Sequence, residues 1–148
     1  MVMDMEKYMK IALNEAKKAF KKNEVPIGAV IVKNGKIISK AHNKKENNNI
    51  ATNHAEIIAI NKACKKIKNW RLLDCTLYVT VEPCMMCFGA ILESRISKII
   101  YGTTNENCGY ISKNEVGDNI EIIGNICEEE CKNIIKLFFE NKRKNPSK

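Results

Sequence analysis

Residues 75–87 read CTLYVTVEPCMMC, and this stretch is the most informative part of the chain. Its first part, residues 75–81, is rich in Thr, Val, Leu and Tyr and predicts a strand. Pro83 then suits the first turn of a helix, because it needs no N–H partner there. The stretch therefore predicts a strand that leads directly into a helix, with Cys84 and Cys87 at the helix start.

Hydrophobic periodicity predicts further elements on both sides of this stretch. Before it come an amphipathic helix, a hairpin signalled by Asn34-Gly35, and a second amphipathic helix that Thr52 or Asn53 would cap. In chain order, the expected helices are 4–22, 54–67, 83–94 and 128–142, the expected strands are 25–32, 36–41, 75–81, 97–101 and 120–123, and the longer loops are 42–53 and 103–119. This alternation indicates an α/β domain whose helices cover both faces of a mixed sheet.

The composition fits one globular domain over residues 1–148, with 45% hydrophobic and 28% charged residues. We expect neither a signal peptide nor a membrane span, because the first residues mix acids with apolar groups and no stretch reaches roughly 20 uncharged apolar residues. The expected location is the cytoplasm, where the seven cysteines stay reduced. A net charge of +8 favours polyanions such as RNA, although a solvated lysine-rich surface has the same composition.

Two motifs supply the candidate chemistry: His54-Ala55-Glu56 and Cys84-x-x-Cys87, each at the start of a predicted helix. The positive end of a helix dipole lowers the pKa of a thiol and favours the thiolate that a metal needs. With His54, the ligands number three, and the fourth tetrahedral position of zinc stays open for water, as in catalytic sites. Glu56 points away from His54 and is free to move protons. The motifs predict a catalytic Zn²⁺ site, one ion per subunit, in preference to a redox cysteine pair.

These motifs, together with Asn43 and the segments 24–30, 76–82 and 94–96, resemble the cytidine-deaminase-like superfamily and, within it, the bacterial tRNA adenosine deaminases of the TadA type. The resemblance runs nearly from end to end. It implies a three-layer α/β/α cytidine-deaminase-like fold with a mixed five-stranded central sheet. It also implies a homodimer that converts adenosine to inosine at the wobble position of a tRNA anticodon.

The same resemblance implies which residues meet the substrate. Pro26 and Ile27 would wall the base pocket, while Asn43 and Ala55 would lie at the base edge or ribose. Asn105 would contribute from the loop 103–119, and Phe139 and Arg143 would meet the anticodon loop. Phe139 has an alternative place in the core together with Phe138, since both lie on an amphipathic helix.

The loop 103–119 departs from the small, Gly-Ala-rich segment that the family often has, so two other functions stay open. One is deamination of a free base or nucleoside of the guanine or cytosine type. The other is a zinc-stabilised RNA-binding module without activity. Glu56 argues against the module, because a structural zinc site has no use for that carboxylate.

Overall fold

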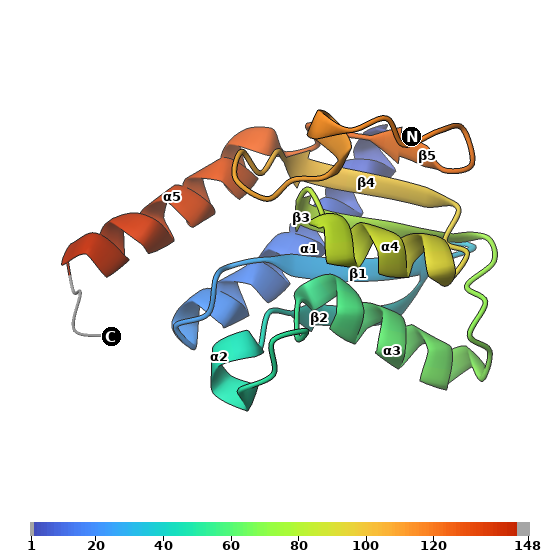
Figure 1. The fold of residues 1–148 in the computed structure, drawn as a ribbon, viewed down its shortest axis with the longest axis horizontal. Coiled ribbons are helices and arrows are strands. Elements are labelled where there is room, and N and C mark those ends of the chain that lie inside the picture. Colours follow the sequence, from blue (N-terminus) through green and yellow to red (C-terminus); the bar gives the residue numbers. More distant parts are fainter. Residues whose placement is uncertain (1, 145–148) are drawn as a thin grey trace.

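A five-stranded sheet forms the centre of the computed structural model, which describes residues 2–144 (Figure 1). The strand order is β2-β1-β3-β4-β5. The strands are β1 (Gly28–Lys33), β2 (Lys36–His42), β3 (Cys75–Val81), β4 (Lys98–Thr103) and β5 (Glu121–Ile123). β1 pairs antiparallel with β2 and β3, whereas β3, β4 and β5 run parallel. The predicted mixed five-stranded sheet is confirmed.

Helices cover both faces of this sheet, which gives three layers (Figure 1). The helices are α1 (Val2–Lys21), α2 (Lys45–Asn48), α3 (Ala55–Ile67), α4 (Met85–Glu93) and α5 (Glu128–Lys144), with a short 3₁₀ helix η1 (Ile111–Lys113). α3 and α4 pack on one face around side chains such as Leu77 and Ile99. α1 and α5 pack on the other, around Val30 and Ile100. None of the helices within residues 2–144 combines the length and apolarity that a membrane span requires.

The hairpin turn and α1 hold the N-terminal half of the sheet together. Asn34 and Gly35 have φ angles of 50° and 73°, as the predicted two-residue turn of type I′ requires. At the other end of β1, α1 approaches the backbone very closely: a methyl group on Gly28 would lie 1.9 Å from the carbonyl oxygen of Ala12. Only glycine lets the helix pack this near to the strand.

Two local predictions are wrong. The segment 42–53, expected as a loop, begins with the last residue of β2 and contains α2. The cap of α3 is neither Thr52 nor Asn53; the N-cap residue is His54, and the first helical N–H, that of Ala55, donates to Oδ1 of Asn43 at 2.7 Å. The stabilising group for α2 also comes from a distant part of the chain, because Glu24 accepts the N–H groups of Glu46 and Asn47.

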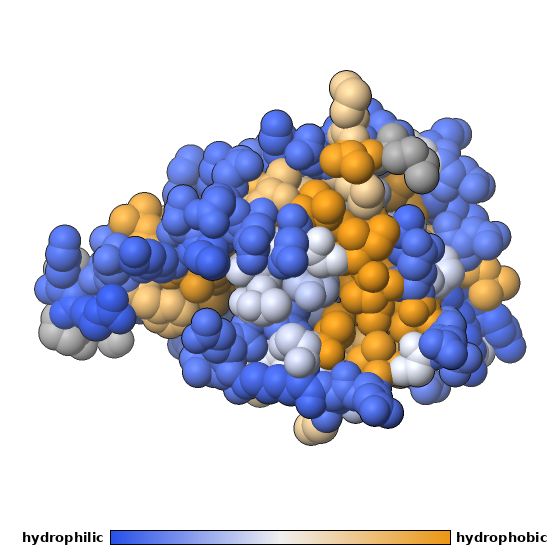
Figure 2. All heavy atoms as spheres, turned by 90° about the horizontal axis from the view of Figure 1, so that it is seen from above, coloured by the Kyte–Doolittle hydropathy of each residue, from blue (hydrophilic) through white to orange (hydrophobic). Residues whose placement is uncertain are grey.

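β5 is short and lies at the edge of the sheet. Its half-buried side chains alternate between the two layers: Ile122 packs against the α3–α4 side and Ile123 against the α1–α5 side. Figure 2, which looks down on this part of the molecule, shows an apolar strip between hydrophilic side chains. The remaining surface of that view is mostly hydrophilic.

Candidate active site

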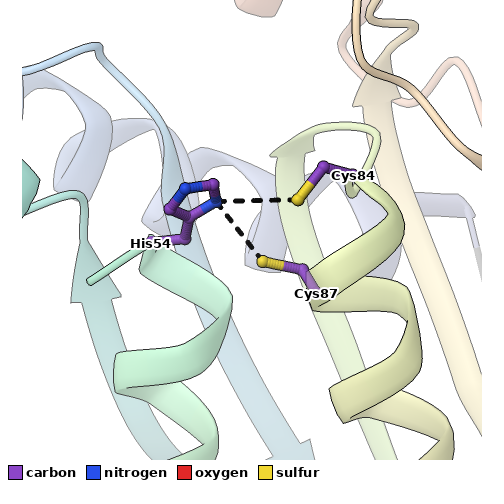
Figure 3. Close-up of side chains that lie close together, drawn as sticks. All are labelled: His54, Cys84 and Cys87. Carbon is purple, nitrogen blue, oxygen red and sulfur yellow. Dashed lines mark hydrogen bonds between the residues drawn. The ribbon is translucent and has the colours of Figure 1, made fainter. Parts of the chain in front are cut away.

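The candidate site lies where α3 and α4 begin side by side on one face of the sheet (Figure 3). His54 is the N-cap residue of α3, and Cys84 is the N-cap residue of α4. Cys87 follows in the first turn of α4 and is fully buried. Both N-cap side chains face the space between the two helix starts, where they meet each other and Cys87.

The three side chains converge on one point. Nδ1 of His54 lies 3.7 Å from Sγ of Cys84 and 3.5 Å from Sγ of Cys87, and the three atoms lie within 4.8 Å of one another. Zinc–nitrogen and zinc–sulfur bonds of about 2.0 and 2.3 Å at a tetrahedral angle place N and S roughly 3.5 Å apart. The three residues can thus hold a metal ion as they stand, with Nδ1 as the imidazole ligand, an assignment that the sequence left open.

The ionisation of the two thiols is strongly unequal. Cys87 and His54 hydrogen-bond to Sγ of Cys84 and lower its pKa to about 3. The neighbouring Cys84 and burial raise the pKa of Cys87, and the bond to Cys84 raises the pKa of His54. A divalent cation between the sulfurs would favour the thiolate at both positions.

Glu56 lies next to this group in the first turn of α3, with only 3% of its surface exposed. Burial raises the pKa of its carboxyl group to about 7, while the side chain of Cys87 donates a hydrogen bond to it. Near neutral pH, such a group takes up and releases a proton with equal ease. The site therefore combines three potential metal ligands with a buried acid–base group.

Known proteins similar to this chain share one chemistry. A family model described as MafB19-like deaminase matches residues 3–143. A tRNA-specific adenosine deaminase of Bacillus subtilis (strain 168) is 43% identical over 146 residues, covering 94% of this chain and 91% of the relative. The chain belongs to the tRNA-specific adenosine deaminase family. Its fold and its convergent His/Cys/Cys group agree with this membership.

Solved structures agree with this family. A structure from work on A-to-I editing at the wobble position of transfer RNA has 36% identity and a TM-score of 0.80, and the match covers 85% of this chain and 96% of that one. A guanine deaminase of Bacillus subtilis has 40% identity and a TM-score of 0.64, with 67% and 64% covered. Deamination of a ring amine is common to both named activities.

Beside the His/Cys/Cys group, the residues expected to form the base pocket of a family member lie together. The backbone N–H of Asn43 donates to the carbonyl oxygen of Ile27 at 3.2 Å, while its Oδ1 accepts the N–H of Ala55. Pro26 is buried, and Ile27 is half-buried. Because the N–H of Ala55 already has a partner inside the protein, any contact that it makes with a base must be shared with Asn43.

The residues expected to meet the anticodon loop are spread along α5. Phe138 is buried and packs edge-on against Phe20, with ring centroids 5.7 Å apart, so it belongs to the core. Phe139 is 43% exposed and lines a groove of about 660 Å³ with Val25, Asn47 and other residues. Arg143 is exposed near the end of α5, which extends beyond the sheet (Figure 1).

The sequence did not reveal the role of two buried carboxylates. Glu24 precedes the expected pocket wall, and Glu82 precedes Pro83 at the end of β3; they are 1% and 2% exposed. Glu24 accepts hydrogen bonds from the backbone of α2, and Glu82 accepts them from the backbone of segment 105–112. A charged residue between a strand and a proline, as at Glu82, was the available signal. Asn105, the last expected contact, is one of the donors to Glu82.

Proposed function

We propose that this protein converts adenosine to inosine at the wobble position of a tRNA anticodon, with one Zn²⁺ per subunit held by His54, Cys84 and Cys87. The observation that carries the proposal is the convergence of these three ligands beside the buried carboxyl group of Glu56. Membership of a family whose curated relatives are named tRNA-specific adenosine deaminase supports this substrate. We take the chain as one catalytic domain acting in the cytoplasm, where thiols stay reduced.

Zinc, when bound, lowers the pKa of a water molecule so that it attacks the amine-bearing carbon of the adenine ring. Glu56 takes the proton from the attacking water and passes it to a ring nitrogen. Glu56 then takes the second water proton from the hydroxyl group added to the ring carbon and transfers it to the amine, so that a carbonyl forms, the C–N bond breaks, and water and adenosine give inosine and ammonia. Burial, which disfavours the charged form of this carboxyl group and raises its pKa, suits a group that both accepts and donates the proton. Asn43 holds the start of α3, and with it Glu56, in place.

Several features support RNA as the substrate. The net charge of +8 attracts the phosphate backbone. The groove beside Phe139 also contains Lys22 and Lys142, so it offers an aromatic face and positive charge together. We propose that this groove and Arg143 receive the anticodon loop, while Pro26 and Ile27 wall the pocket for the flipped adenine.

We also propose that the protein is a homodimer that pairs through α4. The outer side of this helix carries three exposed apolar side chains, Met85, Met86 and Leu92, and the loop after α3 adds Trp70 and Leu73. A patch of this kind favours contact with an identical surface. Light scattering of the purified protein should give twice the mass of one chain. The Met85→Glu variant should give the mass of a single chain, because a charge would then lie in the proposed interface. A wild-type monomer at micromolar concentration would contradict the dimer.

One experiment separates the candidate functions. The zinc-loaded protein is incubated with tRNA that carries adenosine at the wobble position and, separately, with free guanine, cytosine and their nucleosides. We expect inosine in the tRNA. Ammonia from a free base without inosine in tRNA would instead favour the guanine-deaminase type, to which the solved enzyme of Bacillus subtilis belongs. Bound zinc without any turnover would favour a binding module.

Two substitutions test the assigned roles. Glu56→Gln should retain zinc but lose turnover, because the amide cannot carry the proton. Cys87→Ala should lose the metal. Glu6→Gln, the same chemical change at an exposed position of α1, is the matched control and should leave both unchanged. Normal turnover by Glu56→Gln would exclude the proposed proton transfer.

A further inference from the structure

Glu82 connects the end of β3 to a segment that is distant in sequence. Its buried carboxylate accepts the N–H of Asn105 at 2.8 Å, the N–H of Ser112 at 2.7 Å and the Oγ–H of Ser112 at 2.9 Å. A carboxylate removed from water requires such donors, and bonds to an ionised acceptor are stronger than neutral ones. Two of the three donors are main-chain groups, so the carboxylate holds the path of segment 105–112.

Segment 105–112 runs directly along the start of α4. The N–H of Tyr110 donates to the carbonyl oxygen of Pro83 at 3.0 Å, and Gly109 pairs with Cys84 in an antiparallel bridge. The Tyr110 ring also stacks on Phe88, with centroids 5.0 Å apart. These contacts place the segment against one of the three candidate metal ligands. In Figure 1 it is the orange loop beside the beginning of α4.

The segment is wrapped tightly around the carboxylate. A methyl group on Gly109 would lie 2.2 Å from Oε1 of Glu82 and 2.5 Å from the carbonyl oxygen of Asn105, so no side chain fits there. Oδ1 of Asn105 accepts the N–H groups of Asn107 and Cys108, both at 3.1 Å, and closes a turn. The exposed residues 106–108 form the tip of this turn, and its base is tied to Glu82.

We propose that Glu82 is a positioning residue for substrate binding: it fixes segment 105–112 beside Cys84, where the segment walls the opening that receives the nucleotides next to the target adenosine. The inference rests on the proposed tRNA deamination. Glu82 meets no metal ligand through its carboxylate bonds, since all three donors belong to Asn105 and Ser112. Loss of the Glu82 carboxylate should therefore weaken the binding of RNA more than it slows the chemical step.

Glu82→Gln tests the proposal, because it keeps the shape but turns one acceptor oxygen into a donor that faces other donors. With an anticodon stem-loop RNA as substrate, we expect KM to rise about tenfold, the equivalent of one charge-assisted hydrogen bond, while kcat stays within about threefold. Zinc content should remain at one ion per chain. Cleavage by trypsin after the exposed Lys113 should accelerate, because the neighbouring Ser112 is released. Glu6→Gln is again the matched control.

Ser112→Ala provides a second test that does not disturb the carboxylate. It removes the Oγ–H donor but keeps the N–H donor, so KM should rise about threefold. In the double variant, the two effects should not add, because they act through one contact. If Glu82→Gln does not fold, the KM of the Ser112→Ala variant decides whether the inference about Glu82 holds.

The outcomes separate this inference from the proposed function. If the wild-type protein turns over the RNA but Glu82→Gln or Ser112→Ala has the same KM as the wild type, the inference is overturned and the proposed function stands. A folded Glu82→Gln protein that loses zinc, or loses kcat at constant KM, would also overturn it, because the residue would then act through the metal site. Absence of wild-type turnover on RNA would overturn the proposed function and the inference together.

Discussion

Replacing Glu24 by Gln should cost stability in a way that depends on pH. The Glu24 carboxylate accepts the N–H groups of Glu46 and Asn47, at 3.0 and 2.6 Å, and a bond from the Asn47 amide. Burial alone would raise its pKa, but these donors outweigh burial and leave the pKa below its ordinary value of 4.5. The glutamine keeps one acceptor and turns an NH₂ group toward donors. We expect the free energy of unfolding to fall by about 2–3 kcal/mol at neutral pH.

The sign of the pH effect follows from the lowered pKa. The stabilisation by ionised Glu24 is fully present above 4.5 and is lost as the pH falls through the pKa of the folded state. Urea unfolding of both proteins, from about pH 7 down to about pH 3, should therefore show a difference that narrows below 4.5. Glu6→Gln, exposed on α1, should show no such difference. This account of Glu24 would be refuted if the two proteins had the same free energy of unfolding at neutral pH, or if the difference between them did not change with pH.

Three further outcomes are expected. Asn43→Ala removes the acceptor at the start of α3 and should lower the free energy of unfolding by about 1–2 kcal/mol and reduce RNA deamination, whereas exposed Asn61→Ala on the same helix should do neither. Gly28→Ala should cost about 3 kcal/mol or more in urea unfolding, because its methyl group would meet the carbonyl oxygen of Ala12. A chelator should abolish deamination, and added zinc should restore it; activity that persists in metal-free protein would contradict the zinc mechanism.

Elements that depend on local pattern were predictable from the sequence. The strand expected at 75–81 is β3 with the same bounds, and Asn34-Gly35 forms the expected hairpin turn. The helix expected from 83 begins two residues later, since Cys84 is its N-cap residue. In each case the deciding residues are neighbours in the chain, so periodicity and turn chemistry are sufficient.

Elements that depend on distant partners were not predictable. The four residues of α2 carry no periodic signal, and the helix is supported by Glu24, more than 20 residues earlier. The acceptor at the start of α3 comes from Asn43 rather than from the residues next to His54. Phe138 and Phe139 could not be distinguished by pattern, because their difference arises from packing of α5 beside Phe20 on α1.

The carboxylate of Glu82 holds the loop mainly by its main chain, because two of its three donors are backbone N–H groups. Side-chain identity matters only at the base of the loop, where Ser112 supplies the third donor, Oδ1 of Asn105 closes the turn, and the space around the carboxylate restricts position 109 to glycine. The side chains of residues 106–108 take no part in these contacts, so the tip of the loop can vary while its base stays anchored. For protein engineering, this makes the exposed tip at 106–108 an exchangeable cassette, in which altered RNA preference can be sought without rebuilding the metal centre.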